Sequence, residues 1–158
     1  MILITPVIRV EKIWGHLATW GHKLAKIMPS AIRQRYLSNS PYQHFAFWIM
    51  FKHGDRVKRA EIIRESLAES KKVNNILRLG MLDDIDRHDL EQLAVKIKVP
   101  CMVIAGSRDD IVRVSSIESL VKNMENAKLV MVKDAGHLLP IEHPHFTAQT
   151  IKSWLANL

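Results

Sequence analysis

The sequence predicts an α/β fold: a short parallel sheet of about three strands, with flanking helices and a long helical segment. The apolar run at 101–105 is bounded by Pro100 and Gly106, as expected for a strand buried on both faces. From there the pattern is strand, helix, strand, helix, which produces parallel strands joined by right-handed crossovers. With 158 residues, 47% of them apolar, the chain can bury a core without a disulfide or a metal.

The predicted elements fall into three segments. Residues 1–8 contain a first strand at 2–4, which ends before Pro6. Residues 9–95 are helical, and apolar spacing predicts helices at 14–28, 42–52, 56–79 and 83–95. Residues 96–158 contain a strand at 101–105, a helix at 115–124, a strand at 128–132, a loop at 134–144 and a helix at 146–158. The last helix is expected to turn inward Ile151, Trp154, Leu155 and Leu158.

The formal net charge of +7 is unevenly distributed. Residues 9–59 carry a net +8 and eight of the ten aromatic residues, whereas the rest of the chain carries a net −1. The basic segment is either a solvated helix surface or a docking surface for an anionic partner, such as acyl carrier protein, coenzyme A or acidic lipid headgroups. Arg33 and Arg35 are the residues whose charge reversal would weaken such docking. Nucleic acid is disfavoured because no recognised binding module accompanies the charge.

The cysteine count and the length of the apolar runs predict a cytoplasmic protein. Cys101 is the only cysteine, which excludes an internal disulfide and favours a reducing compartment. The longest apolar run, 45–51, is far shorter than the roughly 20 residues that span a bilayer. The first residues also lack the pattern of a secretory signal.

Two loops that follow predicted strands carry residues with catalytic chemistry. Asp109 lies in the loop after the strand at 101–105, and His137 lies in the loop after the strand at 128–132. If these strands are neighbours, the carboxylate and the imidazole leave the sheet at the same edge and come within hydrogen-bonding reach. An aspartate that holds a histidine in one tautomer is the acid–base part of a nucleophilic triad.

The stretches 97–112 and 126–144 together resemble the acid-bearing and histidine-bearing strands and loops of the α/β-hydrolase fold family. The resemblance implies that Asp109 is the triad acid and His137 the general base. It makes residues 10–90 similar to the helical cap of such enzymes, and 1–6 similar to the strand before the cap. It also implies an esterase, a lipase-like enzyme or a carbon–carbon bond hydrolase, acting without a cofactor on an ester or related carbonyl of an apolar molecule.

The nucleophile elbow of that family has no counterpart in the sequence. No serine lies in a G-x-S-x-G pattern, and no upstream oxyanion loop is recognisable. Because the family places its nucleophile before the cap, we expect a partial α/β-hydrolase fold, a truncated C-terminal half that is inactive alone. The alternative is a non-catalytic interaction module or degenerate remnant that binds an anionic partner through the basic cap. An incomplete sheet is expected to self-associate through its exposed edge.

Other residues near the predicted pair have weaker claims to a catalytic role. Asp110 competes for the acid role, but the spacing from Gly106 favours Asp109 and leaves Asp110 as a solvated loop residue. Ser107 is a poor substitute nucleophile because it belongs to the turn after a strand. Cys101 lies in a buried strand, where a thiol behaves as a small apolar residue.

The remaining candidates concern metal and substrate. Zinc ligation is disfavoured because Pro144 predicts a rigid helix start among the residues Glu142, His143 and His145. The aromatic residues of the cap either pack among themselves or line a substrate pocket. The candidates for substrate contact are Trp20, Phe47, Trp48 and Leu138.

Overall fold

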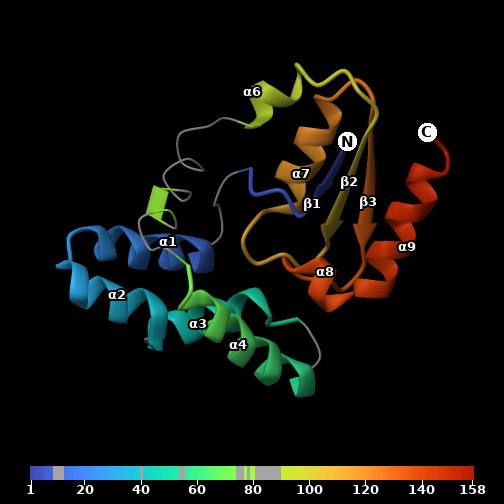
Figure 1. The fold of residues 1–158 in the computed structure, drawn as a ribbon. Coiled ribbons are helices and arrows are strands. Elements are labelled where there is room, and N and C mark those ends of the chain that lie inside the picture. Colours follow the sequence, from blue (N-terminus) through green and yellow to red (C-terminus); the bar gives the residue numbers. More distant parts are fainter. Residues whose placement is uncertain (9–12, 40, 54–55, 74–76, 78, 81–89) are drawn as a thin grey trace.

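A computed structural model describes the chain except for residues 9–12, 40, 54–55, 74–76, 78 and 81–89 (Figure 1). Its centre is a parallel sheet of three strands, in the order β1 (Ile2–Ile4), β2 (Cys101–Gly106) and β3 (Ala127–Val132). Val103 in the middle strand is paired with Leu3 on one side and with Leu129 on the other. The predicted short parallel sheet is confirmed, and β2 and β3 are neighbours.

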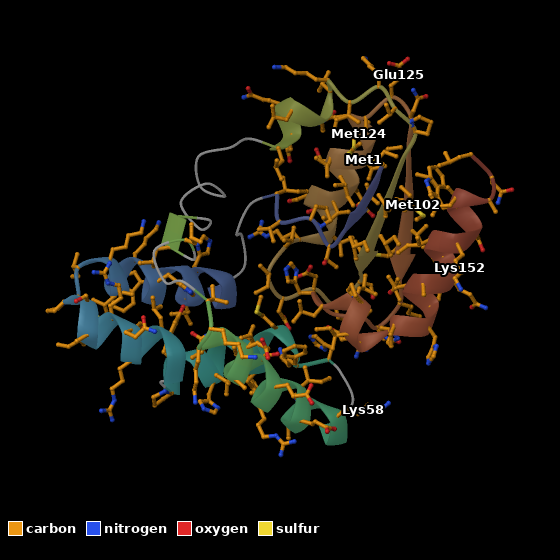
Figure 2. All side chains as sticks on the ribbon, viewed as in Figure 1. Met1, Lys58, Met102, Met124, Glu125 and Lys152 are labelled. Carbon is orange, nitrogen blue, oxygen red and sulfur yellow. The ribbon has the colours of Figure 1, made fainter. Side chains whose placement is uncertain are left out.

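The middle strand is covered on both faces, because helices pack on opposite sides of the sheet (Figure 1). All six residues of β2 are buried. Cys101, Val103 and Ala105 pack in the apolar cluster of α7 (Val114–Lys122). Met102 and Ile104 point to the other face, toward α9 (Pro144–Leu155), as Figure 2 shows for Met102. The continuous apolar run of the strand therefore reflects its two buried faces.

The helices between β1 and β2 are α1 (Ile13–Lys26), α2 (Ser30–Asn39), α3 (Pro41–Met50), α4 (Arg56–Ser70) and α6 (Leu90–Ala94). Of these helices, α1 to α4 lie on the side of the molecule to which the strands β2 and β3 point, whereas α6 lies at the opposite end of the sheet (Figure 1). The first four pack on one another, and α6 packs against α7. We call α1 to α4 and the turn at 51–53 the cap. Ile49 of α3 belongs to the same apolar cluster as β2 and α7, which joins the cap to the core.

Some cap elements differ from the sequence prediction. Helix α2 was not expected, because its apolar residues share no single face: Leu37 is buried and Ile32 is exposed. The helix predicted at 56–79 ends at Ser70, where a turn at 71–73 follows. Of the helix predicted at 83–95, the described part is α6, and the remainder lies outside the described residues.

The C-terminal segment also differs in two places. The predicted loop at 134–144 contains a one-turn helix, α8 (Leu139–Glu142), whose first residue is buried against the sheet. Leu155 and Leu158 were expected to face inward but are exposed. The reason is that α9 ends at Leu155, beyond the turns where Ile151 and Trp154 pack on the sheet. None of the described helices is long and apolar enough to cross a membrane.

Candidate functional site

Asp109 is held in the loop after β2 by three hydrogen bonds. One carboxylate oxygen, Oδ1, accepts from the backbone N–H groups of Ile111 at 2.7 Å and Val112 at 3.0 Å. The other oxygen, Oδ2, lies 2.7 Å from Nδ1 of His137. Asp109 is only 3% exposed, so this network fixes the carboxylate away from bulk water.

His137 reaches Asp109 from the loop after β3, and it is 7% exposed. The contact bridges the ends of two adjacent parallel strands. Because an ionised carboxylate can only accept hydrogen bonds, Nδ1 carries the proton of the neutral imidazole and donates it to Asp109. The other ring nitrogen, Nε2, is then unprotonated and chemically able to act as a base.

The environment of Asp109 lowers its pKa below the ordinary value of 3.8. Burial of the carboxyl acts in the opposite direction, because it disfavours the charged form. The hydrogen bond and the charge of His137, with the N–H groups of Val112 and Ile111, outweigh that effect. Asp109 is therefore ionised at neutral pH, as an orienting partner of a general base must be.

The two loops are joined by their backbones as well as by the side-chain pair. Ser107 N–H donates to the Val132 carbonyl at 2.9 Å, and Arg108 N–H donates to the Ala135 carbonyl at 2.8 Å. A Cβ atom at Gly106 would overlap the backbone oxygens of Ala135 and Gly136. Glycine is therefore required at the end of β2, because the histidine loop passes directly against it.

Glu142 holds the histidine loop from the other side, a role that the sequence analysis did not identify. Its Oε2 accepts from Gly136 N–H at 2.6 Å and its Oε1 accepts from Leu138 N–H at 3.1 Å. The carboxylate thus binds the two amides that flank His137. The available sequence signal was an acidic residue five positions after the histidine, but only the folding of α8 brings it back to the loop.

Two other loop residues have defined partners. Asp110, which was expected to be solvated, instead lies 2.7 Å from His53 Nε2 and 3.3 Å from Lys52 Nζ of the cap. That expectation is wrong, because the cap covers this side of the loop. The Ser107 hydroxyl accepts a hydrogen bond from Asp134 N–H at 2.9 Å and so braces the turn after β3.

Within the described part of the chain, no group of three histidine, cysteine or acidic side chains is arranged to hold a metal ion.

The residues predicted to contact substrate are spread over the cap and the histidine loop. Leu138 is half-buried next to His137 in the chain. Phe47 lies beside Phe51, Trp48 stacks on Phe45, and Trp20 is 67% exposed on α1. A cavity of about 320 Å³ lies between the cap and α8 instead, and none of the predicted residues lines it. Its walls are formed by Phe51, Lys58, Arg59, Ile62, Ile141, Glu142 and Pro144.

A parallel sheet that carries an aspartate–histidine pair at the ends of adjacent strands, with a helical cap before those strands, has the architecture of an α/β hydrolase. Solved structures agree on the fold. An α/β-hydrolase enzyme, MGS-M2, from a Medee basin deep-sea metagenome library superposes with a TM-score of 0.74 at 16% identity, over 99% of this chain and 55% of that one. A thermophilic esterase from Thermogutta terrifontis superposes with a TM-score of 0.64 at 21% identity over the same shares.

The family model for serine hydrolase (FSH1) matches residues 24–149, so the chain belongs to that family. Human monoacylglycerol lipase ABHD6 is 33% identical over 88 residues, which are 54% of this chain and 26% of the lipase. Lipase 1 of Psychrobacter immobilis is 23% identical over 120 residues, 74% of this chain and 37% of that protein. The matched segments therefore cover from about a quarter to somewhat more than a third of the length of these relatives.

Proposed function

We propose that Asp109 and His137 form the acid–base part of a serine hydrolase triad that cleaves an ester or related carbonyl of an apolar small molecule. The observation that carries this proposal is the buried 2.7 Å contact between His137 Nδ1 and Asp109 Oδ2 at the ends of adjacent strands. Membership in a serine hydrolase family supports it, as do the relatives named as lipases and the structural neighbour named as an esterase.

In this mechanism His137 carries one proton, and Asp109 orients the His137 ring. Asp109 holds the His137 ring through Nδ1, which keeps Nε2 unprotonated and oriented. Nε2 accepts the proton of a serine hydroxyl as that oxygen attacks the substrate carbonyl. The resulting imidazolium is stabilised by the nearby carboxylate, and it gives the proton to the leaving alcohol as the bond between the carbonyl carbon and the alcohol oxygen breaks. The acyl-serine that remains is hydrolysed by a water molecule that Nε2 deprotonates, which releases the acid and restores the serine hydroxyl.

The serine is not among these 158 residues by any recognisable motif, since no G-x-S-x-G pattern occurs. We therefore assign the nucleophile and the oxyanion-binding amides to polypeptide other than these residues. The coverage of the structural neighbours supports this assignment, because the chain matches only 55% of the length of MGS-M2 and of the Thermogutta esterase. The 158 residues alone are expected to be inactive.

The cavity between the cap and α8 supports an apolar acyl portion of the substrate. Phe51, Ile62 and Ile141 are apolar parts of its wall, and Lys58, Arg59 and Glu142 add charged groups that could face a polar end of the substrate. Trp20, Phe47, Trp48 and Leu138 stay candidates for substrate contact in the complete site. Because the cap and α8 enclose the space together, we expect the cap to select the acyl portion of the substrate.

The test begins with the coding sequence that precedes Met1. The longest open frame that includes this chain is expressed, labelled with a fluorophosphonate probe and assayed on p-nitrophenyl esters of short and long acyl chains. We expect a G-x-S-x-G serine in that frame, labelling by the probe and ester hydrolysis. His137→Ala should lower kcat by roughly 10⁶-fold and Asp109→Asn by roughly 10⁴-fold.

His145→Ala is the matched control, because it removes an exposed imidazole on α9 and should leave the activity unchanged. Full activity in His137→Ala would overturn the proposal. So would an upstream frame without a nucleophile motif, which would favour the alternative of a non-catalytic interaction module.

The finer proposals about partners and location rest on the sequence alone. Docking of an anionic carrier at the basic cap predicts steep salt dependence and weaker binding when Arg33 and Arg35 are reversed. Self-association through an unpaired edge of the sheet predicts a dimer or larger species in gel filtration. The cytoplasmic location is tested by imaging a tagged protein.

A further inference from the structure

The loop 109–112 is attached to two parts of the molecule at once. Asp109 is bonded to His137 of the core. The next residue, Asp110, makes hydrogen bonds with two residues of the cap, His53 and Lys52. Both lie in the turn at 51–53, after the end of α3. One peptide bond therefore separates the carboxylate that holds the imidazole from the carboxylate that holds the cap.

Apolar contacts join the same loop and the same end of α3. Ile111 and Val112 are buried in the cluster of β2 and α7, and Ile49 of α3 lies in that cluster too. Arg59 of α4 adds a polar contact, because its guanidinium donates to the carbonyl of Lys52 at 3.2 Å. The turn at 51–53 is thus held by both the core loop and the next cap helix.

The Asp110 cluster differs from an ordinary surface ion pair. A single oxygen, Oδ2, faces both the imidazole of His53 at 2.7 Å and the ammonium of Lys52 at 3.3 Å. The Asp110 side chain is 18% exposed and that of His53 is 20% exposed. Partial burial reduces screening of these charges by solvent. The cluster therefore stabilises the attachment of the cap to the core more than an exposed ion pair would.

We propose that Asp110 is a positioning residue that couples the place of the cap to the Asp109–His137 contact. Because the backbone between the two aspartates is continuous and Ile111 and Val112 are fixed in the core, a shift of the cap turns the peptide that carries Asp109. The attachment of the cap rests on the contacts alone; its consequence for catalysis rests on the proposed function.

The test uses the purified chain and two readouts. Hydrogen exchange of peptides covering α3 and residues 51–53 measures how firmly the cap is attached, and NMR of ¹⁵N-histidine-labelled protein follows the proton on His137 Nδ1. With Asp110→Asn, we expect roughly fivefold faster exchange in α3. The His137 Nδ1 proton resonance should shift or broaden in the same variant. His53→Gln should give the same changes, and the double variant should exceed neither single one.

Asp134→Asn is the matched control. Asp134 is a carboxylate on the same rim, paired with Arg108 at 2.8 Å, and its left-handed backbone conformation (φ 61°) is one that asparagine tolerates. This control should change neither readout. If Asp110→Asn exchanges no faster than Asp134→Asn, the coupling is overturned. Faster exchange with an unchanged His137 resonance would leave Asp110 a purely structural contact and would overturn the positioning role.

The outcomes are separable from those of the proposed function. Loss of cap attachment in Asp110→Asn is measured without substrate, so it stands or fails independently of any ester hydrolysis. A protein in which His137→Ala keeps full activity would end the triad proposal while leaving the exchange result intact.

Discussion

The core and the cap are packed in different ways. In the core, every residue of β2 is buried, and the two loops that carry Asp109 and His137 are joined by backbone hydrogen bonds. In the cap, the buried apolar cluster is much smaller, with Ala25 and Leu37 among its few members, and Trp20 is 67% exposed. The geometry of the Asp109–His137 pair is therefore set chiefly by the sheet edge, with Asp110 as its link to the cap, whereas the surfaces proposed to recognise substrate belong to a layer with a smaller buried core.

This difference assigns separate tasks to the two regions. The proposed role of His137 as a general base requires a fixed orientation of its ring, so the histidine loop would need firmly packed neighbours. A cap that admits and covers a substrate needs side chains that can move. Substitutions of comparable chemistry in the two regions should therefore lower the free energy of unfolding by different amounts. The following experiments compare them.

The largest effect is expected at Gly106. Gly106→Ala places a methyl group against the backbone oxygens of Ala135 and Gly136, which cannot move without displacing the histidine loop. We expect a loss of about 3 kcal/mol or more in the free energy of unfolding, measured by urea denaturation.

Two other glycines sharpen this result. In the cap, a methyl group at Gly21 would meet the ring of Tyr42, which stacks on Tyr36 and is hydrogen-bonded to His22. Because the obstacle is a side chain and not backbone, Gly21→Ala should cost about 1 to 2 kcal/mol in the free energy of unfolding. Gly80→Ala meets nothing within 4 Å and lies in a helical turn, so it should be neutral or slightly stabilising. Equal costs at Gly106 and Gly21 would contradict the distinction between core and cap.

The second effect concerns the fall in the free energy of unfolding at acidic pH. The folded protein lowers the pKa of Asp109 below 3.8, so folding favours its ionised form. That contribution is fully present above the unfolded pKa and is lost as the pH falls through the lower folded pKa. Asp109→Asn should cost about 1 to 3 kcal/mol at pH 7 and should flatten the fall in stability below about pH 4.

The measurement is urea denaturation at pH values between 3 and 7. Asp134→Asn, on the same rim but exposed, should change the free energy of unfolding by less than about 0.5 kcal/mol. If the free energy of unfolding of Asp109→Asn fell as steeply at acidic pH as that of the unchanged protein, the carboxylate would not be stabilised by its buried partners.

The core could be predicted from the sequence better than the cap. The apolar run of β2 and the positions of Asp109 and His137 after neighbouring strands were predictable, because a two-faced buried strand and the order of strands and helices leave a local pattern. The contact of Asp110 with His53 was not, because the two residues are 57 positions apart and only cap packing unites them. The same holds for α2, whose stability comes from Leu37 packing rather than from an amphipathic pattern.

The third effect is expected at Glu142. Glu142→Gln replaces one of the two carboxylate oxygens that accept from Gly136 and Leu138 by a donor, so one flanking amide loses its partner. We expect a loss of about 1 to 2 kcal/mol by urea denaturation and faster hydrogen exchange at 136–138. The matched variant Glu125→Gln breaks an exposed pair with Lys98 and should leave the free energy of unfolding unchanged. Equal losses in the two variants would mean that Glu142 does not hold the loop.

The smallest effect is kinetic and leaves stability untouched. Cys101 is fully buried in β2, and burial raises the pKa of its thiol, which disfavours the reactive thiolate. Native protein at pH 7.5 should therefore react with iodoacetamide more than about 100-fold more slowly than urea-unfolded protein, as followed by mass spectrometry. Ala68→Cys places a thiol on the exposed face of α4 and should react at nearly the unfolded rate. If Cys101 reacted as fast as that exposed thiol, β2 would be accessible to the reagent in the native protein, and the rigid sheet edge next to the Asp109–His137 pair would not exist.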